Sequence, residues 1–168
     1  MVGLSCRKAK KPSLGLLSRG EAMDYKKALE VARKVATKAH EGQADKVGMP
    51  YIQHPMAVCE LVDGEQEKIV ALLHDVVEDT GVTLNDLRNH GFDDEIIAAV
   101  EAITKRKGEE FEKYLQRVKA NEIALAVKFA DIQHNMSPDR YEKLPPETKE
   151  RLVAKYNHAL AYLRGNSV

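Results

Sequence analysis

Residues 69–80 read IVALLHDVVEDT, an apolar run interrupted by the pair His74-Asp75 and followed by the pair Glu78-Asp79. A run with apolar residues on both flanks is typical of a buried helix. Charged side chains are costly to bury unless a partner compensates them, and the stretch contains no Lys or Arg. It therefore predicts a helix that carries ionisable side chains into the protein and needs a compensating cation from elsewhere.

Helical geometry gives these polar residues two alternative roles. Residues four apart share a helix face, so His74 is expected to lie over Glu78, and Asp75 over Asp79. One turn can then hold a metal ion, because imidazole nitrogen and carboxylate oxygen are good ligands for divalent transition metals. The next turn would present two carboxylates to water or substrate. The alternative is a polar helix end with a solvated cluster of charges, and the stretch alone does not decide between the two.

Length and composition limit the class of protein. A chain of 168 residues is expected to form one domain with a substantial core. The net charge of zero and the absence of tryptophan argue against a nucleic-acid partner, because they indicate neither a basic surface nor a base-stacking platform. No apolar run is long enough to span a membrane. Cys6 and Cys59 lie too far apart in sequence for a metal motif and form no disulfide framework, which fits a cytoplasmic location.

The first 22 residues differ in composition from the rest. Residues 1–20 hold five basic residues and no acidic ones, mixed with Gly, Ser and Pro. We interpret 1–22 as a disordered N-terminal extension, with a targeting segment as the alternative, and 23–168 as the folded domain. Residues 21–168 hold 21 basic and 26 acidic residues. An anionic substrate there needs local basic side chains or a metal ion.

The folded part of the sequence predicts helices throughout. Apolar residues recur at helical spacing, and N-cap residues precede several of the runs. No segment shows sustained strand alternation. The predicted fold class is therefore all-α, a single-domain helical bundle with short loops. The expected helices span about 24–41, 55–62, 66–80, 83–89, 93–103, 109–119, 121–136 and 146–163.

A second apolar helix repeats the anomaly of the first. Asp131 lies in the middle of the run 121–136, and Asn135 shares its helix face at i+4. An aspartate in mid-helix is not a cap, so two interpretations remain. It is either a metal ligand or the ion-pair partner of Lys128 at i−3.

A fourth ligand-type residue, His54, stands at a predicted helix N-terminus, since proline suits the first helical turn and Pro55 follows it. Together with His74, Asp75 and Asp131, it makes a set of two nitrogen and two oxygen ligands from three helices. This set suits Mn, Fe or Zn better than Mg or Ca, which prefer oxygen ligands alone. We therefore expect the chain to bind one divalent metal ion.

Three stretches and a short fourth one carry a resemblance to a known family. Residues 40–54 read HEGQADKVGMPYIQH, residues 72–80 read LLHDVVEDT and residues 128–135 read KFADIQHN, with LPPE at 144–147. This combination resembles the HD-domain superfamily, specifically the hydrolase domain of the Rel/SpoT-type alarmone enzymes and their small single-domain relatives. The similarity covers roughly residues 24–163. It implies an HD-type helical bundle with a central metal site.

The resemblance also implies individual roles. The four expected ligands match the family's metal ligands, usually of one manganese ion, with Fe²⁺ or Zn²⁺ as alternatives. Glu78 and Asp79 match the acidic pair that handles the attacking water, and Lys46 and Asn135 match substrate contacts. The family removes pyrophosphate from the 3′ position of guanosine tetra- and pentaphosphate. Its long members add a synthetase domain, for which this chain has no room, so we expect a hydrolase and not a synthetase.

Two positions depart from the family pattern. The pattern places an Arg-Lys pair after the first helix, where this chain has Asp45-Lys46, and a basic residue where this chain has Ile132. Both departures weaken the case for the guanosine alarmone as substrate. The alternatives are an HD phosphohydrolase acting on another nucleotide or phosphoester, and a nucleotide-binding regulatory module without turnover.

The predicted activity is metal-dependent hydrolysis of a phosphoester or pyrophosphate in a small-molecule substrate. The metal ion is expected to lower the pKa of a bound water and to polarise the phosphoryl group. Glu78 or Asp79 would orient or deprotonate that water. The predicted substrate contacts are Lys46, Tyr51, Asn135, Arg151, Lys155 and Tyr156. The sequence leaves the oligomeric state open.

Overall fold

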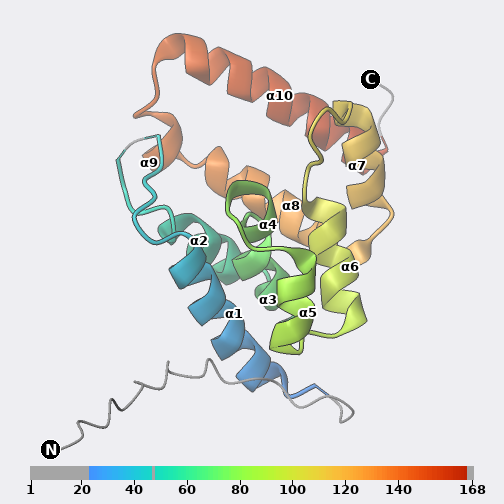
Figure 1. Cartoon of the computed structure of the whole chain (residues 1–168). Helices are drawn as coiled ribbons and strands as arrows, with labels where there is room; N and C mark the ends of the chain where they lie inside the picture. The colour runs from blue at the N-terminus through green and yellow to red at the C-terminus, as the bar shows by residue number, and fades with distance from the viewer. Residues whose placement is uncertain (1–22, 47, 166–168) are drawn as a thin grey trace, which may run out of the picture.

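The computed structural model of the protein describes residues 23–46 and 48–165, which form ten helices and no strand (Figure 1). The prediction of an all-α fold is confirmed for this part of the chain, and the predictions for residues 1–22 lie outside it. None of the described helices is both long and apolar enough to cross a bilayer. The helices are α1 (Tyr25–Ala39), α2 (Gln53–Glu60), α3 (Glu65–Leu73), α4 (Val76–Asp79), α5 (Leu84–His90), α6 (Asp94–Ile103), α7 (Phe111–Lys119), α8 (Glu122–Asn135), α9 (Pro138–Tyr141) and α10 (Pro146–Arg164).

Side-chain caps fix the starts of several helices where the sequence predicted them. At α5, Thr83 and Asp86 form a reciprocal capping box, and Gly91 ends the helix with a φ of 92°, which glycine adopts without strain. Three further caps each accept a hydrogen bond from the amide three residues later, and these are Asp24, Asp93 and Asn121.

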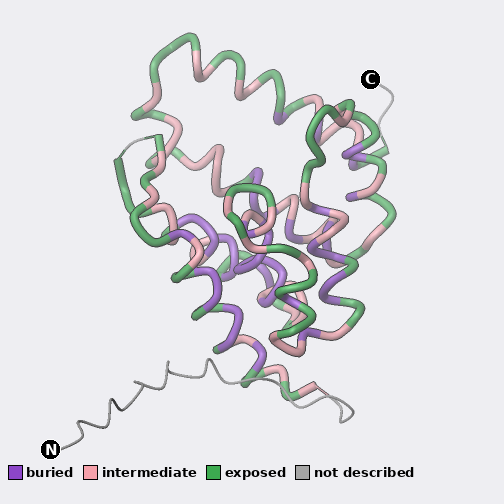
Figure 2. Tube along the Cα trace, viewed as in Figure 1, coloured by how far each residue is buried: buried purple, intermediate pink, exposed green. Residues whose placement is uncertain are grey.

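Helices α3 and α8 form the centre of the fold. Every residue from Ile69 to Leu73 is buried, and α3 packs against α1, α2, α6 and α8. The larger hydrophobic cluster draws on α1 to α6 and α8, and the smaller one on α7, α8 and α10. Figure 2 shows this contrast, with buried positions concentrated in the lower part of the molecule and few along α10. The two helices in which the sequence places ionisable residues within apolar runs therefore each pack against several other helices.

The predicted helix over 66–80 is wrong in one respect, because it is interrupted at His74 and Asp75. The His74 ring nitrogen Nδ1 lies 2.7 Å from the Ala71 carbonyl oxygen, which in an unbroken helix would accept from the Asp75 amide. The side chain thus takes the place of a main-chain bond, and α3 ends there. The helical turn resumes as α4, where the Asp79 amide donates to the Asp75 carbonyl at 2.9 Å.

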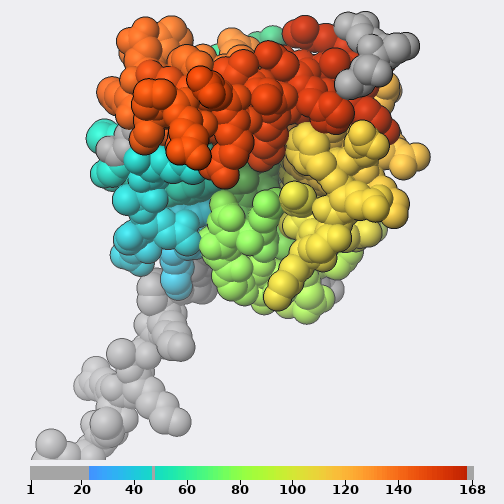
Figure 3. Space-filling view, turned by 90° about the horizontal axis from the view of Figure 1, so that it is seen from above, coloured from blue at the N-terminus to red at the C-terminus, as the bar shows by residue number. Residues whose placement is uncertain are grey.

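Other boundaries shift by one or two residues, and one element was not predicted. Helix α9 begins at Pro138 and turns the chain from α8 into α10. Figure 3 shows α9 and α10, in orange and red, as a continuous band across the upper part of the view. This band and the loop around residues 44–51 border the cavity described next.

Candidate active site

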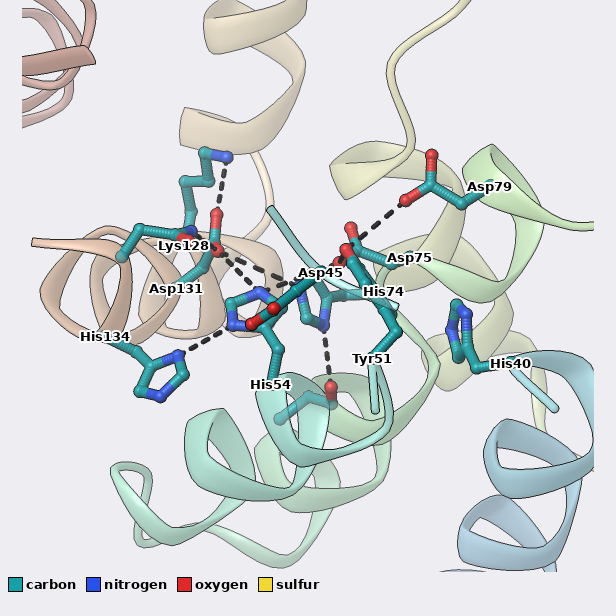
Figure 4. A network of polar contacts seen from close by, with 12 residues as sticks. His40, Asp45, Tyr51, His54, His74, Asp75, Asp79, Lys128, Asp131 and His134 are labelled. Atoms are coloured by element: carbon teal, nitrogen blue, oxygen red, sulfur yellow. Dashed lines mark hydrogen bonds and ion pairs between the residues drawn. The ribbon is translucent and has the colours of Figure 1, made fainter. Parts of the chain in front are cut away.

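A cavity of about 430 Å³ opens where α2, α3, α4 and α8 meet, with α9 and α10 on its other side. Its lining is rich in ionisable side chains and contains both acidic and basic residues. Figure 4 shows the polar network at its base. We call this base the floor, formed by His54, His74, Asp75 and Asp131.

Three buried ligand-type side chains meet on the floor from three separate helical segments. His54 comes from α2, His74 from the end of α3 and Asp131 from α8, and one ligand atom from each lies within 4.8 Å of the other two. The Asp131 Oδ1 atom lies 3.1 Å from His54 Nε2 and 3.9 Å from His74 Nε2. Such a group can hold a divalent metal ion.

Asp75 adds a fourth ligand-type atom to the floor. Its Oδ2 lies 3.0 Å from His74 Nε2 and 3.6 Å from His54 Nε2. The Tyr51 hydroxyl donates a hydrogen bond of 2.6 Å to the same oxygen and lies 3.3 Å from Asp79 Oδ2. The structure therefore brings all four expected ligands together, and Tyr51, which we had expected to contact substrate, orients one of them.

The ring nitrogens of the two floor histidines have distinct roles. His74 Nδ1 faces the Ala71 carbonyl oxygen, which can only accept, so Nδ1 carries the proton and Nε2 faces the floor. His54 Nδ1 lies 2.7 Å from His134 Nδ1, so one of these nitrogens donates to the other. When His54 Nδ1 is the donor, its Nε2 keeps the lone pair that a metal ion requires.

The pKa values of the ionisable side chains on and behind the floor indicate that the site favours a positive charge beside its carboxylates. Burial opposes protonation of His74, yet the carboxylates of Asp75 and Asp131 raise its pKa to about 9. Burial likewise opposes ionisation of Asp75, but His74 lowers the pKa of its carboxyl to about 2. Burial and the neighbouring His54 lower the pKa of His134 to about 4. The carboxylates are thus held ionised and require a cation beside them.

The floor residues fit a divalent metal ion. His74 Nε2 is buried and makes no hydrogen bond to the described residues, although the Asp75 carboxylate is close by. A metal ion between the two imidazoles and the two carboxylates would give this nitrogen a partner and offset the negative charge. The donor set of two nitrogens and two oxygens suits Mn, Fe or Zn.

Asp131 makes the ion pair that one interpretation predicts, and it also lies in the group of side chains that could hold a metal ion, as the other requires. Its Oδ2 forms an ion pair of 2.8 Å with Lys128, and its Oδ1 faces the histidines. Burial opposes charge on Lys128, but Asp131 keeps the pKa of the ammonium raised. Asn135, predicted on the same helix face, donates to Asp131 Oδ1 at 2.5 Å. Lys128 and Asn135 thus hold the carboxylate in one orientation.

The other predicted site residues lie mostly around the cavity. Glu78 and Asp79, on α4, line it beside the floor, and burial raises the pKa of each carboxyl. Among the predicted substrate contacts, the cavity wall includes Lys46, Tyr51, Asn135, Lys155 and Tyr156. Arg151 does not line the cavity and is exposed on α10.

The sequence analysis missed several residues of the site, and one of them, His134, contacts His54 without lining the cavity. His134 lies three residues after Asp131, and this helical spacing was the one signal that could have revealed it. Lys105 and Arg140 do line the cavity, but they come from a turn and from the unpredicted α9. Arg140 Nη1 pairs with Asp45 Oδ2 at 3.3 Å. No local pattern links two residues so far apart in sequence.

Comparisons with known proteins agree on the family. A family model described as HD domain matches residues 32–136. A probable GTP pyrophosphokinase of Mycobacterium leprae is 38% identical over 145 residues, which cover 79% of this chain and 18% of that protein. The bifunctional (p)ppGpp synthase/hydrolase SpoT of Escherichia coli K12 is 34% identical over 148 residues, covering 76% of this chain and 21% of that protein. The chain thus spans about a fifth of the length of these curated relatives.

The fold also matches a solved structure, described as a metazoan ortholog of SpoT that hydrolyzes ppGpp and plays a role in starvation responses. The match has a TM-score of 0.69 at 21% sequence identity and covers 84% of this chain and 88% of the other. At this identity the match supports the arrangement of helices and leaves the chemistry to the residues of the site.

Proposed function

The chain belongs to the HD domain family, and from that premise we propose that it is a metal-dependent phosphohydrolase. The first substrate to test is guanosine 3′,5′-bis(diphosphate), from which it would release pyrophosphate at the 3′ position. An Escherichia coli O157:H7 protein, 34% identical over 148 residues, is named for this reaction.

One observation carries the proposal. Four ligand-type side chains converge on the floor, and the carboxylates of Glu78 and Asp79 line the same cavity outside the floor. A site that only binds metal has no need of a second pair of carboxylates in the cavity. When bound, a divalent ion supplies Lewis-acid activation of water and of a phosphoryl oxygen.

The residues beside the floor would handle protons and orientation. Burial raises the pKa of the Glu78 carboxyl and of the Asp79 carboxyl, which makes each a better proton acceptor than an exposed carboxylate. Asp79 is oriented by the Tyr51 hydroxyl. We propose that Glu78 accepts a proton from the attacking water and that Asp79 orients this water molecule.

Basic side chains would offset the charge of the phosphate groups. Lys46, Lys105 and Lys155 reach the cavity from three different segments. Burial and the nearby ammonium of Lys128 lower the pKa of Lys155, as expected where like charges converge. An anionic substrate would relieve this repulsion. Tyr156 lines the same wall, where its side chain would contact a base or sugar.

The experiment is a release assay with a nucleotide panel. The protein is freed of metal, its metal content is measured, and it is reloaded with Mn²⁺, Fe²⁺ or Zn²⁺. We expect one metal ion per chain and pyrophosphate release from the guanosine alarmone, most rapid with Mn²⁺. Binding of nucleotide without release of phosphate or pyrophosphate in any arm would contradict the proposal and favour a regulatory module.

A second substrate is favoured by one observation at the cavity wall. Asp45, in the position where the family pattern has arginine, lies beside Lys46 and pairs with Arg140. An arginine at this position can stack on a nucleobase, and a carboxylate cannot, so the departure removes a contact that would favour guanosine. Another nucleotide or phosphoester is therefore the alternative, and the same panel distinguishes the two.

A further inference from the structure

Arg117, on α7, joins the end of α6 to the turn that follows it. Its guanidinium donates hydrogen bonds to the main-chain carbonyls of Glu101 at 2.7 Å, Ala102 at 3.2 Å and Thr104 at 2.8 Å. The last carbonyls of a helix have no partner within the helix. Arg117 therefore supplies partners for two of the last carbonyls of α6, those of Glu101 and Ala102, from a different helix.

The same guanidinium holds the other end of the turn. Arg117 Nε donates to Glu109 Oε1 at 2.7 Å and Nη2 donates to Glu109 Oε2 at 2.6 Å, a bidentate pair. Glu109 Oε2 also accepts from the Arg106 amide at 3.0 Å. These bonds to Arg117 lower the pKa of the Glu109 carboxyl to about 2. The turn over residues 104–109 is thus fixed at both ends by one side chain.

Lys105 lies between the two fixed ends and faces the cavity. Its main-chain amide donates a hydrogen bond of 2.7 Å to Glu78 Oε2. Among the described residues no other hydrogen bond reaches the Glu78 carboxylate, which projects from the four-residue helix α4. The orientation of this carboxylate therefore depends on where the turn holds the Lys105 amide.

We propose that Arg117 is a positioning residue of the proposed hydrolase, which acts by holding the Lys105 amide against Glu78. The expected effect of Arg117 on turnover rests on the proposed function. Its expected effect on the Lys105 amide rests on geometry alone. Arg117 does not line the cavity, so it acts through the turn and not on the substrate. The position of the Lys105 amide thus depends on the hydrogen bonds that Arg117 donates to the carbonyls and to Glu109, and not on its positive charge alone.

The test is a double-mutant cycle between Arg117→Met and Glu78→Gln on the full chain with metal bound. We expect Arg117→Met to lower kcat about tenfold and to change KM less than about threefold. The reason is that the variant loses the orientation of the Glu78 carboxylate but keeps every contact with the substrate. In the Glu78→Gln background the same change should alter kcat by less than about twofold. An equal loss in both backgrounds would overturn the proposal, since a general structural defect would act without Glu78.

A matched control and a milder variant guard against an effect of folding. Lys113→Met removes an exposed ion pair with Glu110 on the same helix and should leave kcat unchanged. Glu109→Gln keeps Arg117 and one acceptor oxygen, and it should lower kcat less than Arg117→Met does. Equal effects of Lys113→Met and Arg117→Met would count against the inference.

Amide hydrogen exchange tests the geometry without turnover. Arg117→Met should speed exchange of the Lys105 amide about tenfold, and so should Glu78→Ala, while the Val118 amide inside α7 stays protected. If the wild-type protein hydrolyses nothing in the panel, the proposed function fails, and this measurement still decides whether Arg117 positions the amide. An unchanged Lys105 amide in Arg117→Met would refute the inference on its own.

Discussion

The floor of the cavity and its rim are built by different means. The floor residues lie on α2, on α8 and at the end of α3, three helices that pack against one another, and three of the four are buried. The rim, which we define as Asp45, Lys46, Lys105 and Arg140, comes from a loop, a turn and the four-residue helix α9. Helix packing fixes the floor, whereas ion pairs and turn hydrogen bonds fix the rim. Changes to the floor should therefore abolish metal binding and turnover, and changes to the rim should alter substrate preference.

The largest effect is expected from Asp131→Ala. The change removes one ligand and leaves Lys128 buried without its partner, which should lower the free energy of unfolding by about 3–5 kcal/mol. Metal content, measured by mass spectrometry after purification, should fall well below one ion per chain, and turnover should be lost. Asp139→Ala, at an exposed carboxylate on α9, is the control. Full metal content in Asp131→Ala would show that this carboxylate is no ligand.

The next effect tests the division between the floor and the carboxylates beside it. Glu78→Gln and Asp79→Asn should each retain the metal ion and lose at least about 100-fold in kcat, the usual contribution of a group that transfers or directs a proton. Parallel measurement of metal content and of single-turnover rates separates the two properties. Loss of the metal ion in either variant would assign that carboxylate to the ligand set instead.

A smaller effect is expected behind the floor, at His134. Its ring stacks on His54 with centroids 4.9 Å apart, and its Nδ1 faces His54 Nδ1. His134→Phe keeps a ring in place and removes the nitrogen, which should weaken metal affinity about tenfold. Saturating metal should restore most of the turnover. Unchanged affinity, measured by competition with a chelator, would mean that His54 needs no partner for its orientation.

The contrast between floor and rim also explains what the sequence could predict. His74, Asp75 and Asp131 interrupt apolar helical runs, where an ionisable residue is visible without a structure, and Pro55 marks His54 as the start of a helix. Helix periodicity predicted that Asn135 shares a face with Asp131, and their hydrogen bond confirms it. The floor could therefore be assembled from local patterns alone.

The rim could not be assembled in this way. Arg140 meets Asp45, and Arg117 meets Thr104, across turns whose course depends on tertiary packing. The interruption after α3 was missed for a related reason, since the histidine side chain replaces a main-chain bond at Ala71. Periodicity carries no information about such side-chain to main-chain exchanges.

The smallest effect concerns specificity at the rim. Asp45 Oδ2 pairs with Arg140 and Oδ1 accepts the Met49 amide at 2.9 Å, so this carboxylate both shapes its own loop and joins it to α9. Asp45→Arg would remove both contacts and set two guanidinium groups side by side. We expect KM for the preferred substrate to rise about threefold to tenfold, with metal content and single-turnover chemistry unchanged, as befits a change confined to binding.

A charge exchange makes the prediction sharper. The double variant Asp45→Arg with Arg140→Asp restores an ion pair between the loop and α9, so it should recover much of the lost substrate affinity. The single variant Asp45→Asn should lose less affinity than Asp45→Arg, because its side-chain oxygen still accepts a hydrogen bond from the Met49 amide. The opposite result is equally informative. An arginine that stacks on the guanine base would gain about 2 kcal/mol, which corresponds to a rise in kcat/KM of up to about 30-fold. If Asp45→Arg alone raises kcat/KM on the guanosine alarmone in this way, then the gain from stacking exceeds the loss of the ion pair with Arg140. In that case the rim tolerates a change of charge that the floor does not, and Asp45 does not determine which substrate is bound.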